Sequence, residues 1–262
     1  MHSSTTLPDG SARIDASASL ASLAVHPLLR ERFPLLATAC ASEPAGDATL
    51  AADLAQRGRC PWLQRGAPCL RNGGRECFAL GGDNRLLAIL DGGPSWLVHP
   101  SQPGVALVAL DASIEIHDAR GSSRTVPASE FFVLPTHRPD AETVLHPGER
   151  VIAALLPAES ALGIQRFTLV RDDTSGEVLV SLAAARRRDG EVRLVLGGVS
   201  PRPYRVYNSI EEETIAGGLD DDTIEGLAER ALLDAEPLSQ NGFKVELAAT
   251  LLRDAIRELA QE

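Results

Sequence analysis

The spacing of apolar residues divides the chain into segments of two kinds. Six segments have the alternation or the composition of β-strands; they are residues 113–117, 124–127, 149–156, 165–171, 178–184 and 192–196. Apolar residues at helical spacing predict helices in residues 20–36, where two prolines interrupt the pattern, and in residues 223–233 and 243–259. Residues 105–110 form a continuous apolar run that fits either a helix or a buried strand.

This order of elements predicts an α+β fold with two domains. Antiparallel strands followed by packed helices are typical of that class, and Asp189–Gly190 between two apolar runs is a strong hairpin signal. We place the domain boundary between residues 14–158 and residues 162–262, where a proline ends a strand. Residues 1–13 are small and polar and predict a disordered tail. Asp222 is placed to cap the helix that follows it.

Composition and charge exclude several classes of protein. The chain has 262 residues, 44% of them hydrophobic and 23% charged, which is the balance of a globular protein with a substantial core. A net charge of -11 argues against nucleic acid or an anionic membrane as a partner. No apolar run reaches the roughly 20 residues of a membrane helix, and the N-terminus lacks the pattern of a secretory signal, so a cytoplasmic location is expected. The acidic runs at residues 211–213 and 220–222 predict solvated faces.

Four cysteines are too few for a disulfide scaffold, and three of them lie in one unusual loop. Cys60, Cys69 and Cys77 are spaced C-x8-C-x7-C within residues 59–95, among Gly, Pro and Arg residues that favour a loop. A loop of this length is uncommon unless it is functional or disordered. Three thiols gathered in it suggest ligands of a metal centre, one short of the usual four. Cys40 lies on an Ala-rich helix face, where a small core residue is expected.

Motifs spread over nearly the whole chain carry a resemblance to one family. They include R-C-P at residues 59–61, G-x-N-R at 82–85, H-P-S at 99–101, H-P-G-E at 146–149 and N-G-F-K at 241–244. In this combination the chain resembles the flavin-carrying medium subunit of the xanthine dehydrogenase family of molybdenum hydroxylases. It looks most like the periplasmic aldehyde oxidoreductase branch, whose flavin subunit also carries a [4Fe-4S] cluster in this loop.

The resemblance implies a fold, partners and a second location. The fold would be a remnant of the vanillyl-alcohol-oxidase-type FAD-binding domain, followed by a C-terminal domain like that of the CO dehydrogenase flavoprotein, an antiparallel sheet plus helices. The partners would be a molybdopterin-bearing large subunit and a [2Fe-2S] small subunit. Periplasmic export together with a partner subunit is the alternative to a cytoplasmic location.

The flavin positions that the resemblance implies have changed. The family motif T-x-G-G-N-L, whose glycines let the backbone approach the flavin pyrophosphate, has Ala51, Ala52 and Asp53 in place of Gly-Gly-Asn. Glycine can adopt positive φ and present bare N–H groups to an anion, whereas alanine obstructs this conformation and Asp53 adds a negative charge. The aspartate that follows H-P-S in the relatives is Gln102 in this chain.

Two further parts of the flavin site differ from the family. An aromatic motif of the relatives corresponds to residues 174–177, which contain no aromatic ring. The first glycine-rich phosphate loop of the family would precede Ile14. We therefore expect FAD, the cofactor that the family implies, to have been lost.

The cluster positions have changed less. The resemblance assigns Cys60, Cys69 and Cys77 as three of four ligands, and Ser95 stands where the fourth cysteine is expected. Three alternatives stay open: a [4Fe-4S] cluster completed by serine or an outside ligand, a [3Fe-4S] cluster with three thiolates, and relict thiols without iron.

These features lead to a hypothesis of function with two alternatives. The leading interpretation is a medium subunit that is not catalytic by itself, docks on the large and small subunits and relays electrons through a residual cluster. The alternatives are an FAD-containing electron-transfer subunit completed by a partner chain and an assembly factor for the molybdenum subunit. The family places the substrate pocket in the large subunit, so this chain does not identify a substrate.

Overall fold

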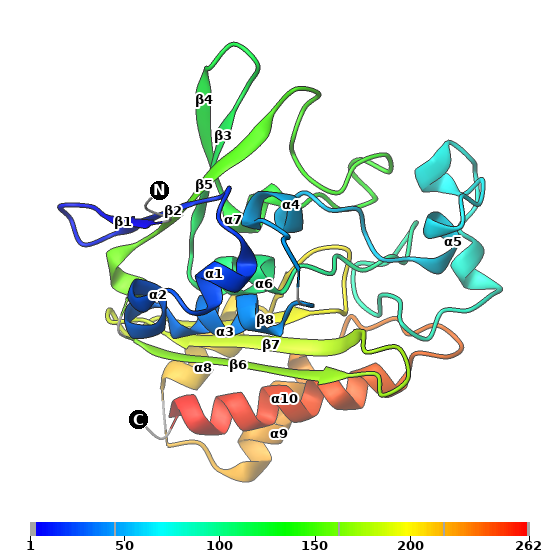
Figure 1. Ribbon diagram of the computed structural model, residues 1–262. Helices are drawn as coiled ribbons and strands as arrows, with labels where there is room; N and C mark the ends of the chain where they lie inside the picture. The colour runs from blue at the N-terminus through cyan, green and yellow to red at the C-terminus, as the bar shows by residue number, and fades with distance from the viewer. Residues whose placement is uncertain (1–3, 45, 162, 217, 261–262) are drawn as a thin grey trace.

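The computed structural model describes residues 4–44, 46–161, 163–216 and 218–260, and it contains two antiparallel sheets (Figure 1). Strands from the first 156 residues form one sheet, and strands between residues 164 and 205 form the other. Helices of the N-terminal half cover one face of the second sheet, and the C-terminal helices cover its opposite face. The predicted α+β class is confirmed.

The first sheet has five strands in the order β1-β2-β5-β3-β4. They are β1 (Ser4–Thr6), β2 (Ala12–Asp15), β3 (Ser113–His117), β4 (Ser123–Pro127) and β5 (Arg150–Leu156). Alternate residues of β3 are buried, as its period-two pattern predicts. The predicted disordered tail over residues 1–13 is wrong from residue 4 onward, because β1 pairs with β2 and β2 pairs with β5, which satisfies their backbone groups. Residues 1–3 lie outside the described residues.

Several short helices pack between the two sheets. Pro27 and Pro34 begin two of these helices, at a position where the missing N–H costs nothing. The ambiguous run at residues 105–110 is helical, because Ser101 caps it by accepting a hydrogen bond from the Gly104 N–H (2.8 Å) and because the helix packs between α3 and the second sheet. These helices are α1 (Leu20–Ala24), α2 (Pro27–Arg32), α3 (Pro34–Ser42), α4 (Leu50–Leu54), α6 (Gln102–Ala109) and α7 (Ala128–Phe131).

The second sheet is covered on both faces. Its strands are β6 (Ile164–Arg171), β7 (Val178–Arg186), β8 (Val192–Gly197) and β9 (Tyr204–Arg205), in sequential order. The C-terminal helices are α8 (Asn208–Ile215), α9 (Asp221–Ala231) and α10 (Phe243–Ala260). The first eight residues of β7 are all buried, because α6 packs on one face of this strand and α10 on the other. Gly190 has a φ of 91° and makes the turn between β7 and β8, as the Asp-Gly pair predicts.

Two predictions about acidic residues are wrong in detail. The cap of α9 is Asp220, whose carboxylate accepts a hydrogen bond from the Thr223 N–H (2.8 Å), and Asp222 lies inside the helix. Glu211 belongs to α8 and is buried rather than solvated, because Arg205 neutralises it (2.6 Å).

The cysteine loop is closed at its base by an antiparallel bridge between Arg59 and Val98. It extends away from the two sheets on one side of the molecule (Figure 1). Its regular structure consists of three short pieces, which are α5 (Pro61–Gln64), η1 (Leu70–Asn72) and η2 (Phe78–Leu80), the last two being 3-10 helices. Cys40, in contrast, is buried in α3, which confirms it as a core residue.

Lys244, the only lysine of the sequence, ties the C-terminal helix to this loop. Its side chain is fully buried, and its ammonium group donates to the carbonyls of Leu86 (3.1 Å), Leu87 (3.0 Å) and Gly198 (2.6 Å). A buried cation needs such partners, because an unpaired one costs several kcal/mol. None of the helices in the described residues is long and apolar enough to cross a membrane.

Candidate functional site: a polar pocket and a cysteine cavity

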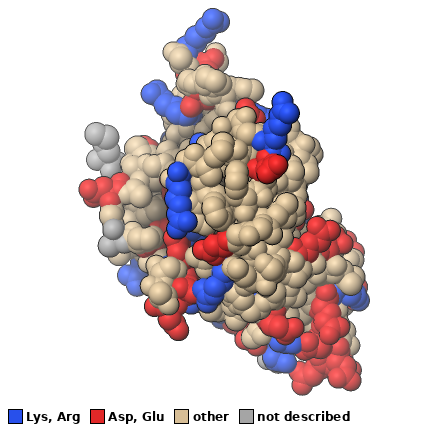
Figure 2. Space-filling model, turned by 90° about the vertical axis from the view of Figure 1, so that its right-hand side faces the viewer, with Lys and Arg blue, Asp and Glu red and all other residues tan. Residues whose placement is uncertain are grey.

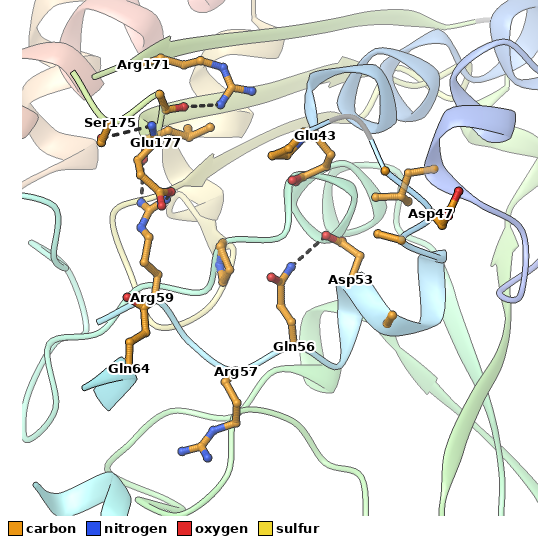
Figure 3. A pocket seen from close by; sticks show the side chains of 18 residues that line it. Glu43, Asp47, Asp53, Gln56, Arg57, Arg59, Gln64, Arg171, Ser175 and Glu177 are labelled. Carbon is orange, nitrogen blue, oxygen red and sulfur yellow. Dashed lines mark hydrogen bonds and ion pairs between the residues drawn. The ribbon is translucent and has the colours of Figure 1, made fainter. Parts of the chain in front are cut away.

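A polar pocket with a volume of about 650 Å³ opens between α4, the loop after α3 and the turn between β6 and β7 (Figure 3). We call it the polar pocket, and its charged lining includes Glu43, Asp53, Arg57, Arg59, Arg171 and Glu177. The structure thus brings two of the predicted flavin positions, Ala52 and Asp53, into one pocket with residues 175–177, to which the resemblance assigns an aromatic motif of the family.

The segment that the resemblance assigns to a phosphate loop is helical in this protein. Thr49 caps α4 by accepting a hydrogen bond from the Ala52 N–H (3.2 Å), so this N–H is already occupied. Asp53 is buried and accepts hydrogen bonds from the Ser101 hydroxyl and from the Gln56 amide (2.8 Å). Asp53 therefore connects α4 to the residue that caps α6.

The N-terminus of α6 is the other backbone group near the pocket that would attract an anion. Gln102, a predicted flavin position, begins this helix, and its N–H donates to the Glu43 carboxylate (2.9 Å). The Gln102 side chain turns back, and its amide donates to the Pro100 carbonyl (2.8 Å). The Glu43 carboxylate therefore occupies the N-terminus of α6, where an anion would otherwise bind.

Most side-chain donors of the pocket arginines already have acceptors, although the Arg59 Nε is buried without a partner among the described residues. Arg59 donates to the Glu177 carboxylate (2.5 Å) and to the Val178 carbonyl (2.7 Å). Arg171 donates to the Gly176 carbonyl (2.7 Å) and to the Ser42 carbonyl. Arg57 lies at the edge of the pocket and pairs with the Glu142 carboxylate (3.1 Å). A phosphate would have to compete with these acceptors.

The wall of the polar pocket contains a buried carboxyl group whose pKa is shifted. Loss of hydration raises the pKa of Asp53 to about 7, and the nearby Glu43 carboxylate acts in the same direction. Burial also raises the pKa of Glu43. His99, from the H-P-S motif, is buried against Phe132 (ring centroids 4.6 Å apart), and burial lowers its pKa to about 3, so it is a neutral packing residue at physiological pH.

Replacing Asp53 with asparagine should stabilise the protein above neutral pH. Because the folded-state pKa is raised from 3.8 to about 7, the contribution of Asp53 to stability is full below pH 3.8 and is lost as the pH rises through 7. At roughly 1.4 kcal/mol per pH unit between the two values, Asp53→Asn should raise the free energy of unfolding by about 2–4 kcal/mol at pH 8. At pH 4 the change should be small.

Urea unfolding of both proteins across this pH range measures the effect. Asp47→Asn is the matched control, because Asp47 is an exposed carboxylate of the same pocket. Parallel pH profiles for wild type and Asp53→Asn would contradict the assignment.

The second feature is the cysteine cavity, which is lined by Cys60, Cys69, Cys77 and Ser95 together with apolar residues of the loop. It is largely enclosed, and its free volume, about 10 Å³, is small. The four predicted ligand positions, spread over 36 positions of sequence, therefore face one cavity. Burial raises the pKa of the Cys60 thiol.

The spacing of these groups differs from that of a compact metal site. Among the residues that the structure describes, no group of three or more His, Cys, Asp or Glu side chains is arranged to hold a metal ion. An iron–sulfur cluster has another requirement, because its thiolates bind separate iron atoms around a core. The donor set of three thiols and a serine is chemically that of a cluster, and these side chains would have to move apart to admit one.

The sequence analysis missed the charged groups around both features. Glu43, Arg59 and Arg171 lie far apart in the sequence and meet only at the polar pocket. Arg71, which lines the cysteine cavity, was one of many arginines in the loop, and only its position beside Cys69 offered a signal.

Comparisons with known proteins place the chain in a family. No family model matches the chain. The aldehyde oxidoreductase FAD-binding subunit PaoB of Escherichia coli K12 is 32% identical over 257 residues, which are 95% of this chain and 78% of that protein.

Two solved structures share the fold. Quinoline 2-oxidoreductase from Pseudomonas putida 86 aligns over 97% of this chain and 76% of that chain, with a TM-score of 0.68 and 17% identity. Carbon monoxide dehydrogenase from Hydrogenophaga pseudoflava aligns over 95% of this chain and 75% of that chain, with a TM-score of 0.65 and 18% identity. The relationship to PaoB, supported by this shared fold, confirms the resemblance inferred from the motifs. The chain therefore belongs to the family of FAD-binding medium subunits of the molybdenum hydroxylases.

Proposed function

We propose that this chain is a medium subunit of a molybdenum hydroxylase complex that does not bind FAD by itself and relays electrons through an iron–sulfur cluster. The observation that carries this proposal is that carboxylates of the chain itself pair with donors in the wall of the polar pocket. Glu43 occupies the N-terminus of α6, and Asp53 occupies the Ser101 cap. These contacts occupy two donors that a pyrophosphate could use, the Gln102 N–H and the Ser101 hydroxyl.

The cysteine cavity supports the electron-relay part of the proposal. Cys60, Cys69 and Cys77 would hold the cluster, with Ser95 at the fourth position. A bound cluster would accept and pass on single electrons. The chain's part is to surround the cluster with apolar residues, chiefly Leu63 and Leu97, which exclude water and so influence its potential.

The first alternative is an FAD-containing subunit whose site a partner chain completes. It is favoured by the size of the polar pocket, about 650 Å³, and by the name of the relative PaoB, an FAD-binding subunit. The second alternative is an assembly factor that binds the large subunit transiently. Flavin and iron analysis of the protein with any co-purified subunits separates the proposal from the first alternative, because only that alternative predicts stoichiometric flavin.

We expect the chain to purify in a stable hetero-oligomer with a molybdopterin-bearing large subunit and a [2Fe-2S] small subunit. The face with the cysteine loop carries few charged side chains across its middle, whereas acidic residues gather at its lower edge (Figure 2). An apolar groove lies on this loop, between Trp62, Phe78, Leu80 and Trp96, and Phe78 and Leu80 are exposed. Exposed apolar grooves of this kind are typical of protein interfaces.

Size-exclusion chromatography of a tagged chain expressed with its neighbouring genes tests this expectation. Leu80→Asp should weaken the complex by about tenfold or more, since a charge would be buried at the interface. Leu233→Asp is the matched control, because Leu233 is equally apolar and exposed at the end of α9. A soluble, monodisperse monomer without affinity for a molybdenum subunit contradicts the proposal, and a complex that forms only transiently favours the assembly factor.

A further inference from the structure

Arg71 is a buried arginine in the wall of the cysteine cavity. Its side chain is only 2% exposed, although arginine is rarely buried unless it is paired. Arg71 is the second residue of the 3-10 helix η1, and Cys69 precedes this helix as its N-cap. The same short segment therefore positions the cysteine and the guanidinium group.

The guanidinium group has more donors than the protein uses. Its Nε donates to the Ser95 hydroxyl (3.4 Å), and its Nη1 donates to the Ala141 carbonyl (2.7 Å). Its Nη2 is buried and has no hydrogen-bond partner among the described residues. A buried donor without a partner costs about 1–3 kcal/mol, and more when the group is charged, so this donor points to an acceptor that the polypeptide does not provide.

The charge of Arg71 is also incompletely neutralised. The nearest carboxylate is Glu142, at 3.7 Å from Nη1, and the same carboxylate oxygen is closer to Arg57 (3.1 Å). Asp140 is exposed to solvent, where its charge is screened. Arg57 is half exposed, so its charge is screened too, and the buried charge of Arg71 is balanced by one carboxylate at long range.

We propose that Arg71 is the positioning and charge-compensating residue of the cluster held by Cys60, Cys69 and Cys77. Its Nε holds Ser95 at the fourth position, and its Nη2 donates to a sulfur atom of the cluster. The inference rests on the proposed cluster. It assigns the unpartnered donor and the weakly paired charge of Arg71 to one anionic ligand, because a cluster with thiolate ligands carries net negative charge.

Arg71 would influence the reduction potential of the cluster. Reduction adds an electron to the cluster, and a fixed positive charge and a hydrogen bond to sulfur both stabilise the reduced form. Arg71 therefore raises the reduction potential of the cluster. A purely structural role, tying η1 to the loop at Ala141, would not affect the potential.

The test is a redox titration of anaerobically purified protein, with any subunits that co-purify, followed by electron paramagnetic resonance and by iron analysis. Arg71→Gln should shift the midpoint potential of the cluster to a more negative value, and Arg71→Lys should keep the potential close to the wild-type value because lysine keeps the charge. Arg57→Gln is the matched control, because it removes the other arginine on Glu142 and leaves the lining of the cysteine cavity unchanged. Far-ultraviolet circular dichroism confirms that each variant is folded.

The outcomes separate this inference from the proposed function. A potential that Arg71→Gln shifts no more than Arg57→Gln does, or shifts to a more positive value, overturns the role of Arg71 while the cluster stands. Loss of iron from a folded Arg71→Gln protein, with iron retained in Arg71→Lys, supports the role, whereas loss of iron from both overturns it in favour of a structural tie. Wild-type protein without iron overturns the cluster and this inference together.

Discussion

FAD titrated into the purified chain should show no saturable binding in the low micromolar range. Pyrophosphate needs several backbone N–H donors or cations, and each such charge-assisted bond is worth about 1.5–3 kcal/mol. Here Thr49 occupies the donor at Ala52, and Glu43 occupies the donor at Gln102. Losing these two bonds costs about 3 kcal/mol or more, which is about two decades in affinity at about 1.4 kcal/mol per decade.

Quenching of flavin fluorescence measures this binding. PaoB, the FAD-binding subunit of the related enzyme, is the positive control in the same assay. A yellow protein as isolated, or a Kd in the low micromolar range for this chain alone, would mean that the flavin site has moved rather than disappeared. Glu43→Gln with Asp53→Asn should weaken the charge repulsion, and any flavin affinity gained by this pair identifies those carboxylates as the obstacle.

Cys69→Ala should abolish the iron–sulfur absorption contributed by this chain. Cys69 is buried in the cysteine cavity, and a cluster left with two thiolates and a serine loses one of its strong ligands. Iron and sulfide bound to the chain should fall by at least about tenfold, because one lost metal–thiolate bond exceeds the roughly 1.4 kcal/mol that a tenfold change requires. The measurement is visible absorption with iron and sulfide analysis of anaerobically prepared protein.

Cys40→Ala is the matched control for this variant. Cys40 is as well buried as Cys69 but lies in α3, within the core between the two sheets, so its loss should leave the iron content unchanged. Ser95→Cys should make the cluster more resistant to oxygen, since it supplies a fourth thiolate. Iron-free wild type, or iron that survives Cys69→Ala, would show that the three thiols are relicts.

Much of the fold followed from local patterns. The hairpin at Gly190, the strand β3 and the long helix α10 depend on periodicity and turn chemistry within a few residues of each position. The run at residues 105–110 was ambiguous because an apolar helix and a buried strand look alike in sequence. The cap at Ser101 and the packing of α6 against β8 decide in favour of the helix.

The errors occurred where distant segments supply the partner. The segment from Ser4 forms strand β1 because it pairs with β2, and β2 in turn pairs with β5. Strand β5 lies more than 130 residues away in the sequence. Glu211 lies in an acidic run and is nevertheless buried. Arg205 neutralises its charge, and the Leu194 N–H donates a hydrogen bond to its carboxylate (3.0 Å). Charge in a local window could not reveal these contacts.

The sequence by itself determined the family, the α+β class, the cysteine spacing and the replacement of the phosphate-loop glycines by Ala51 and Ala52, since these depend on residue identity and order. Only the tertiary structure showed that Glu43 occupies the end of α6, that Cys60 and Ser95 face one cavity, and that Arg71 stands beside them with an unused donor. The physical reason is that desolvation and charge pairing depend on distance in space. Both are set by packing between segments that the order of residues does not place together.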